Sequence, residues 1–261
     1  MPLFRRFLRS LRSRGIAGTL RRILRLRPPI PPVSPHLIHP FDHLHGTDTS
    51  GLIRGPSLVF NSPSGAYKAV YLAISPSTLT HALTELNIPY AQFTFVDVGC
   101  GKGRALLIAA GFPFARLLGV ELSPGLCGIA RANLATQPDA ARRATILTQD
   151  ATSLVFPRTS LLLFLYDPFP DDALTRFLAN LERQLRDSPR ETYLLYAANR
   201  HAAFMARSGF LELVYDIQIP LSPEDAAIDQ LTYDIQFPQG PDPATRHRIT
   251  HEHYPLYRSR L

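Results

Sequence analysis

Phe95-Val96-Asp97-Val98-Gly99-Cys100-Gly101-Lys102-Gly103-Arg104 decides the fold, because an apolar run leads directly into three closely spaced glycines. This order predicts a strand, a tight turn and then a helix. Glycine has no Cβ atom, so alternate glycines let the backbone turn sharply and approach a ligand beside the positive end of the following helix. The stretch therefore predicts a nucleotide-like cofactor at the edge of an α/β sheet.

The glycine spacing discriminates between classes of cofactor. Dinucleotide-binding turns follow Gly-x-Gly-x-x-Gly, whereas this chain places glycines at 99, 101 and 103, with Asp97 two residues ahead of the first. The position of the third glycine argues against an NAD-dependent oxidoreductase. A cofactor with a cationic amino group and no phosphate suits the acid at Asp97 better.

The pattern Asp97-x-Gly99-x-Gly101-x-Gly103 resembles motif I of the class I S-adenosylmethionine-dependent methyltransferases. Three further landmarks occur in the order of that family, each after an apolar run: Glu121, Gln149-Asp150-Ala151 and Asp167-Pro168-Phe169-Pro170. The resemblance covers about residues 60–240. It implies an α/β fold with a doubly wound, mostly parallel seven-stranded sheet, the Rossmann-like methyltransferase fold.

The resemblance also implies a binding site for S-adenosylmethionine. Asp97 would favour the ammonium group of the cofactor, Glu121 its ribose hydroxyls and Asp150 its adenine amino group. The full set implied for cofactor binding is Asp97, Gly99, Cys100, Gly101, Gly103, Glu121, Leu122, Asp150 and Ala151. Cys100 is also a small residue suited to packing, and no metal site is implied.

The resemblance assigns catalysis to Asp167, Pro168 and Phe169, on the side of the methyl acceptor. This segment resembles the Asp-Pro-Pro-Tyr signature of amino-methylating enzymes but departs from it at Phe169 and Pro170, which argues against methylation of a nucleic-acid base. The segment from Phe95 to Glu121 also resembles non-SET protein-lysine methyltransferases. The preferred hypothesis is N-methylation of a protein lysine. Small-molecule O- or N-methylation, and a catalytically idle cofactor-binding scaffold at a membrane, stay open.

The positive charge of the chain is concentrated at its beginning. Residues 1–27 hold nine of the 28 basic residues and no acid, so the remainder carries 19 bases against 21 acids. Apolar residues three and four apart predict two basic amphipathic helices there. The first-ranked partner of this extension is an anionic membrane surface; RNA and the protein's own domain are the alternatives.

The composition predicts one catalytic domain. The expected location is the reducing cytoplasm, with the protein bound peripherally to the inner membrane surface. The chain has only two cysteines. It contains no long uncharged apolar run of the kind that would predict a signal peptide or a membrane span. We divide it into a basic helical extension (1–27), a Pro-rich linker and lid (28–60) and the S-adenosylmethionine-binding domain (61–261). Four histidines in residues 36–45 lack the compact spacing of a metal site.

Hydrophobic periodicity predicts alternating strands and helices through the domain. Strands are expected at 93–98, 117–121, 145–148, 161–166 and 192–197, and helices at 76–86, 104–110, 124–137, 171–186 and 200–208. Two further β segments, 209–217 and 230–237, are expected to form a terminal antiparallel pair. The remainder, through residue 261, is expected to be an irregular tail.

Overall fold

The structure is a computed structural model that describes residues 30, 32–54, 58–62, 65–68, 70–197, 201–236 and 250–261. The basic extension predicted over residues 1–27 lies outside them. The helices are α2 (Pro40–His45), α3 (Pro76–Thr84), α4 (Arg104–Ala110), α5 (Pro124–Ala135), α6 (Pro138–Arg143), α7 (Asp171–Asp187), α8 (Ala202–Arg207) and α9 (Pro223–Gln236), with short 3-10 turns at Pro35–Leu37, Tyr90–Gln92 and Ala151–Ser153. None of the helices in these residues is long and apolar enough to span a membrane.

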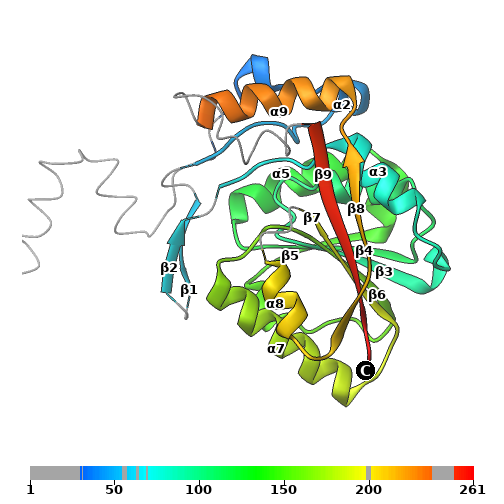
Figure 1. Cartoon of the computed structure of the whole chain (residues 1–261). Coiled ribbons are helices and arrows are strands. Elements are labelled where there is room, and N and C mark those ends of the chain that lie inside the picture. The colour runs from blue at the N-terminus through cyan, green and yellow to red at the C-terminus, as the bar shows by residue number, and fades with distance from the viewer. Residues whose placement is uncertain are drawn as a thin grey trace, which may run out of the picture.

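A seven-stranded sheet forms the centre of the molecule (Figure 1). Its strands are β3 (Phe93–Val98), β4 (Arg116–Glu121), β5 (Ala144–Thr148), β6 (Ser160–Tyr166), β7 (Thr192–Ala197), β8 (Leu211–Pro220) and β9 (His251–Ser259). Their order is β5-β4-β3-β6-β7-β9-β8, and β9 runs in the direction opposite to the other six strands. The predicted mostly parallel, seven-stranded α/β fold is confirmed. A separate hairpin joins β1 (Val59–Ser62) to β2 (Gly65–Lys68).

Helices cover both faces of the sheet, which explains the continuous apolar runs of its central strands. Every residue of β3 is buried, and so are the five inner residues of β6. One apolar cluster packs α3, α4 and α5 against one face, and a second packs α7 against the other, as Figure 1 shows. Alternate residues of β3 accordingly divide between the clusters, with Phe95 in the first and Val96 in the second.

The predicted strand over residues 230–237 is wrong, because residues 223–236 form α9. Ser222 precedes Pro223, Glu224 and Asp225, and the Asp225 N–H donates to the Ser222 hydroxyl at 3.1 Å. A capping serine, a proline and acids in the first turn are strong signals for a helix N-terminus. They outweigh the short apolar and polar alternation that suggested a strand.

The predicted irregular tail is also wrong, because residues 251–259 form β9 between β7 and β8. Tyr254, Leu256 and Tyr257 are buried in the core. Pro255 had argued against a strand, since proline cannot donate a ladder hydrogen bond. It lies just beyond the part of β9 that pairs with β7, which spans Leu256 to Arg258. The antiparallel pair was therefore expected correctly, but its second strand lies later in the chain.

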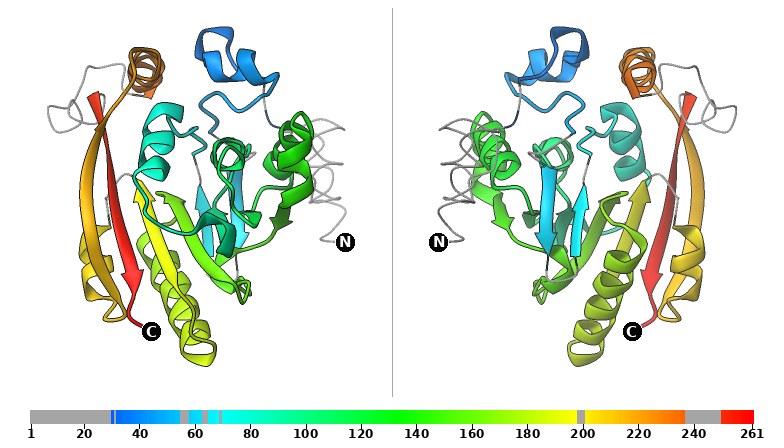
Figure 2. Two further views of the ribbon diagram at one scale, coloured as in Figure 1. Left: turned by 90° about the vertical axis from the view of Figure 1, so that its right-hand side faces the viewer. Right: turned by 90° about the vertical axis from the view of Figure 1, so that its left-hand side faces the viewer.

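The segment before the domain crosses the end of the sheet at which the parallel strands finish. Both views in Figure 2 show α2 and α9 at this end, beyond the strands. Residues 39–54 bond to α4, α5 and α9 through side chains described below. The end of the sheet that carries the candidate site is thus covered by the segment before the domain and by α9.

Candidate functional site

The turn after β3 has the backbone that only glycine adopts easily. Gly99, Gly101 and Gly103 have φ angles of +79°, +53° and +86°. A Cβ atom on Gly99 would lie 2.7 Å from Cβ of Pro168, and one on Gly101 would overlap the ring of Tyr71. The glycines therefore serve both the turn and the close approach of two neighbouring segments.

Backbone hydrogen bonds tie this turn to β4. The N–H groups of Gly99 and Cys100 donate to the carbonyl of Val120, at 2.8 and 3.1 Å. Gly101 donates instead to Oε2 of Glu121 at 3.0 Å. Two of the amides expected to face a ligand thus hold the turn in place, and the third holds the carboxylate at the end of β4.

Glu121 is buried, and both of its oxygens accept backbone hydrogen bonds. Ser123 N–H donates to Oε1 at 2.7 Å, and the same serine caps α5 by accepting from Leu126 N–H. Burial raises the pKa of Glu121, while the hydrogen bonds from Ser123 and Gly101 oppose that rise. Since each carboxylate oxygen can accept two hydrogen bonds, the group can still accept from a vicinal diol.

Asp97 is a second buried carboxyl beside this turn. Its burial, and then the nearby charge of Glu121, raise the pKa of Asp97 to about 8. A cation placed beside Asp97 would favour its ionised form and lower this pKa. The pair of acids is therefore suited to a ligand that brings a positive charge and hydroxyl groups together.

Asp150 follows β5, next to the end of β4. The strand ends are joined there by a hydrogen bond from Gln149 N–H to the Glu121 carbonyl at 3.1 Å. Oδ1 of Asp150 accepts from Thr152 N–H at 2.9 Å and from its hydroxyl at 2.8 Å, so Asp150 caps the short turn that contains the buried Ala151. The structure brings Asp97, Glu121 and Asp150 to the ends of three adjacent strands.

The two remaining candidates on this side are apolar neighbours of the turn. Cys100 lies in the core, where burial raises the pKa of its thiol. Leu122 packs with Ile53, Tyr71 and Leu126 in a small cluster beside the turn. Cys100 thus has the packing role expected from its size.

Asp167 begins the segment on the acceptor side, directly after β6. Among the residues that the structure describes, Asp167 is the one other than glycine that has a positive φ angle, at +45°. Pro168 lies against Gly99, so this segment touches the glycine turn. Phe169 is buried against Phe177, with ring centroids 5.1 Å apart. Its observed contact is with the core; packing against an acceptor stays a prediction.

Three residues that the sequence analysis did not select join Asp167. Tyr196 donates its hydroxyl to Oδ1 of Asp167 at 3.1 Å, and His201 Nδ1 lies 3.3 Å from the same oxygen. His201 Nε2 lies 3.0 Å from Oδ1 of Asp171. The strand register places Tyr196 beside Leu165, so the rule that neighbouring parallel strands end together could have identified it.

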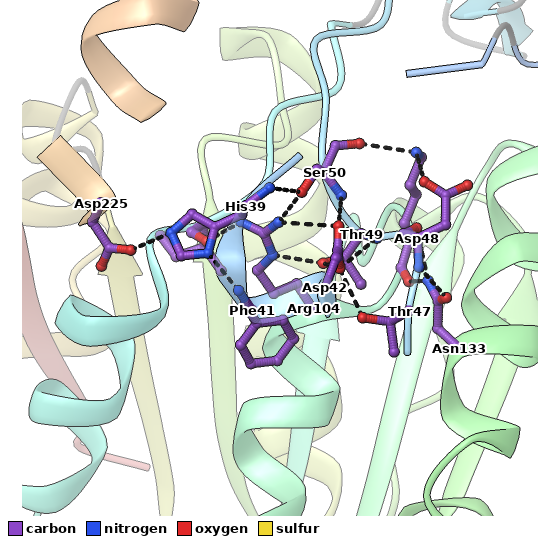
Figure 3. A network of polar contacts seen from close by, with 12 residues as sticks. His39, Phe41, Asp42, Thr47, Asp48, Thr49, Ser50, Arg104, Asn133 and Asp225 are labelled. Atoms are coloured by element: carbon purple, nitrogen blue, oxygen red, sulfur yellow. Dashed lines mark hydrogen bonds and ion pairs between the residues drawn. The ribbon is translucent and has the colours of Figure 1, made fainter. Parts of the chain in front are cut away.

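Two cations hold the segment that covers the glycine turn: Lys102 within the turn, and Arg104 just after it, which Figure 3 shows beside Thr49 and Ser50. Lys102 Nζ donates to Asp48 Oδ1 at 2.6 Å and to the Ser50 carbonyl at 2.9 Å. Arg104 donates to the hydroxyls of Thr49 and Ser50, at 2.7 and 2.9 Å. Both cations are buried, so these partners satisfy charges that would otherwise be costly. Sequence analysis missed this role because the partners are about 50 residues away.

His39 connects the same segment to α9. Its Nε2 lies 2.6 Å from Asp225 Oδ1, and its Nδ1 accepts from Phe41 N–H at 3.0 Å. Asp42 accepts from the N–H groups of Thr49 and Ser50. Burial acts to raise the pKa of Asp42, but its hydrogen bonds with Ser50, Thr49 and Thr47 and the charge of Arg104 lower it overall. His39 is buried, and each of its ring nitrogens therefore has a structural partner.

Comparisons with known proteins agree with this architecture. A family model described as "Methyltransferase domain" matches residues 95–188, from β3 through α7. That range contains every residue selected from the sequence, but neither Tyr196 nor His201. No curated protein matches the chain.

The solved structures with similar folds are named as different kinds of protein. The [4+2]-cyclase SpnF is 16% identical with a TM-score of 0.50, and the match covers 69% of this chain and 80% of that one. A methyltransferase from Geobacter sulfurreducens, in complex with S-adenosyl-L-homocysteine, is 14% identical with a TM-score of 0.44, covering 71% and 90%. A putative RNA methyltransferase from Pyrococcus horikoshii is 12% identical with a TM-score of 0.48, covering 71% and 83%. The likeness to SpnF, at 16% identity, establishes the fold alone.

Proposed function

Since the chain carries a class I S-adenosylmethionine-dependent methyltransferase domain, we propose that it methylates a nitrogen atom, with the side chain of a protein lysine as the preferred acceptor. One observation carries the choice of nitrogen. The carboxylate of Asp167 is 24% exposed at the end of β6, and Pro168 brings its segment into contact with the glycine turn. A carboxylate in that position attracts and orients an ammonium group.

The residues at the ends of β3, β4 and β5 fit the cofactor. The close contacts of the glycine turn leave no room for larger residues, and two acids beside it share one buried site. Asp97 would hold the ammonium group, Glu121 the ribose hydroxyls and Asp150 the adenine amino group. S-adenosylmethionine, when bound, supplies an activated methyl group on a sulfonium. The task of the protein is then to align the acceptor nitrogen and remove its proton.

A protein lysine fits this site because its ammonium ends a long unbranched chain. Such a group can reach a partly exposed carboxylate while the rest of the substrate stays outside. Hydroxyl or amine groups of small molecules are the competing acceptors. SpnF is named a cyclase and has this fold, so a cofactor-binding fold alone does not prove methyl transfer.

Calorimetry with the purified full chain tests the cofactor first. S-adenosylmethionine and S-adenosylhomocysteine should bind and NAD should not. Glu121→Ala should weaken binding about 100-fold or more, because it removes charged hydrogen bonds to two hydroxyls. Glu182→Ala is the matched control, since Glu182 lies on the outer face of α7 in an ion pair with Arg186. If folded protein binds neither compound, the methyltransferase proposal fails and a scaffold role without the cofactor takes its place.

Transfer of a tritiated methyl group tests the acceptor. Protein, RNA and small-molecule fractions are incubated separately with the labelled cofactor, and labelled protein is hydrolysed to identify the methylated residue. Methyl-lysine supports the proposal. Label found only in RNA or only on a small-molecule hydroxyl contradicts it.

We propose that the basic extension contacts an anionic membrane surface, and that the enzyme acts on the inner side of that membrane. Its support is the charge pattern of residues 1–27. Flotation with anionic and neutral vesicles, before and after deletion of residues 1–27, tests it. Flotation that is unchanged by the deletion would contradict the proposal.

A further inference from the structure

Four polar side chains form a continuous line at the ends of β6 and β7. Asp167 follows β6, Asp171 begins α7, Tyr196 lies in β7 and His201 directly precedes α8. The Tyr196 hydroxyl lies 3.1 Å from Asp167 Oδ1 and 2.5 Å from His201 Nδ1. The other ring nitrogen of His201 lies 3.0 Å from Asp171 Oδ1. The imidazole therefore bridges two carboxylates.

The line of side chains begins at the candidate acceptor position, passes through the core and ends at solvent. The side chain of Asp167 is 24% exposed and that of Asp171 is 71% exposed. Tyr196 and His201, between them, are both buried. Within the described residues, a proton that entered at Asp167 could pass through the buried Tyr196 and His201 and reach water at Asp171.

The geometry provides a place for one additional proton. The Tyr196 hydroxyl has a single proton, and Asp167 and His201 are acceptors beside it in the part of the chain that the structure describes. When His201 is neutral with its proton on Nε2, it donates to Asp171 and its Nδ1 accepts from Tyr196. When Nδ1 also takes a proton, the Tyr196 hydroxyl turns toward Asp167. In the first arrangement the extra proton lies on Asp167, which then donates to the Tyr196 oxygen; in the second it lies on His201 Nδ1, and Tyr196 donates to the ionised Asp167.

We propose that Asp167, Tyr196, His201 and Asp171 form a path that carries the acceptor's proton from the methyl-transfer site to solvent. This inference rests on the proposed function. An acceptor ammonium loses one proton to the cluster, and its nitrogen lone pair forms the bond to the methyl carbon. The carbon–sulfur bond breaks, and its electron pair stays on the sulfur. His201 takes the proton on Nδ1 and releases the proton on Nε2 through Asp171 to water.

The groups around His201 suit a transient positive charge. Carboxylates face it from two elements, Asp167 after β6 and Asp171 at the start of α7, at 3.3 and 3.0 Å. Tyr196 faces it from β7. The ring of Phe204 on α8 packs edge-on at 5.7 Å and carries the guanidinium of Arg207, 5.1 Å from the Phe204 ring centre. Tyr196, His201 and Asp171 act through Asp167, so they are positioning residues.

Nuclear magnetic resonance of the unaltered chain, labelled with 15N-histidine, tests the path without an acceptor. The His201→Gln variant identifies the His201 signals. In the neutral ring we expect the proton on Nε2, facing Asp171, while Nδ1 accepts from Tyr196. Asp171→Asn removes the charged acceptor and should raise the fraction of rings with the proton on Nδ1. A wild-type ring with its proton mainly on Nδ1, or a tautomer ratio unchanged in Asp171→Asn, would overturn the path.

Asp172→Asn is the matched control, because Asp172 is the next residue of α7 and pairs only with Arg176 among the contacts described for it. It should leave the His201 signals unchanged. A change as large as that in Asp171→Asn would show a general effect of helix charge and would overturn the path.

Kinetics add a functional measurement, with free lysine and lysine-containing synthetic peptides as probes. Tyr196→Phe and His201→Gln should lower kcat about 100-fold, while the dissociation constant of S-adenosylhomocysteine stays unchanged. Unchanged kcat in both variants would overturn the path. If the wild-type protein binds the cofactor but methylates no amine probe, the proposed acceptor fails, while the histidine spectra still decide the path.

Discussion

The two halves of the candidate site are built in different ways. On the cofactor side, Asp97 and Glu121 are buried, and the Glu121 carboxylate accepts backbone hydrogen bonds from Gly101 and Ser123. On the acceptor side, Asp167 is partly exposed and is held by the side chains of Tyr196 and His201. A site made by backbone is tied to one local sequence pattern, whereas a site made by side chains can change its chemistry with a few substitutions.

The largest effect expected is on the backbone-built side, from Gly101→Ala. Positive φ and overlap with Tyr71 should together lower the free energy of unfolding by about 3 kcal/mol and abolish cofactor binding. Gly128→Ala is the control, because Gly128 lies in α5 with no neighbour within 4 Å of an added Cβ. That variant should gain about 0.5–1 kcal/mol. Chemical denaturation and calorimetry measure both; a stable, cofactor-binding Gly101→Ala protein would remove the distinction between the two sides.

Asp167→Asn should affect the side-chain-built half alone. It removes the charge that orients an ammonium, so kcat/KM for the lysine probes should fall about 100-fold, while the affinity for S-adenosylhomocysteine stays within about twofold. Tritium transfer and calorimetry separate the two quantities. Equal losses of binding and turnover would mean that Asp167 belongs to the cofactor side.

Asp97→Asn should sharpen the comparison through pH. The folded-state pKa of about 8 lies above the unfolded value of about 3.9, so stability from the neutral carboxyl is present at low pH and is lost as the pH rises through about 8. Between these values the wild-type protein should lose up to about 1.4 kcal/mol per pH unit from this group. The variant should lack that loss, and Tm measured from about pH 5 to 9 checks it.

Cofactor binding near neutral pH should also release a proton from Asp97 in the wild-type protein, because an ammonium beside the carboxyl lowers its pKa. Calorimetric titrations in buffers of different ionisation enthalpy measure the release. Identical heats in all buffers, together with parallel pH profiles of Tm, would contradict the placement of a cation beside Asp97.

The smallest effect expected is in the segment that covers the turn. Asp48→Asn removes one partner of the buried Lys102, but the Ser50 carbonyl remains, and Asp48 is largely exposed. Stability should fall by no more than about 1 kcal/mol, with faster amide hydrogen exchange in residues 46–54. Asp139→Asn, in an exposed pair with Arg142, should change neither. Exchange that is unaltered in both variants would mean that the Lys102 pair does not hold the segment.

Sequence reasoning worked where a structural element is specified by its own residues. It identified β3 and β7 to the residue, since both are short, largely apolar strands bounded by turn signals. It failed over residues 230–237, because the signals that start α9 lie seven residues before that range. It also failed over residues 251–259, because Pro255 argued against a strand there. Only the pairing of β9 with β7 and β8 shows that Pro255 is tolerated there.

The sequence by itself determined the α/β class, the glycine turn and the acids that follow three neighbouring strands, because these features depend on local backbone preferences and on apolar runs. The tertiary structure alone decided that Tyr196 and His201 meet Asp167, and that Lys102 and Arg104 hold the segment at 48–50. Those contacts join residues about 30 to 55 positions apart, and the choice among many polar side chains is made only when strand order and burial bring particular ones together.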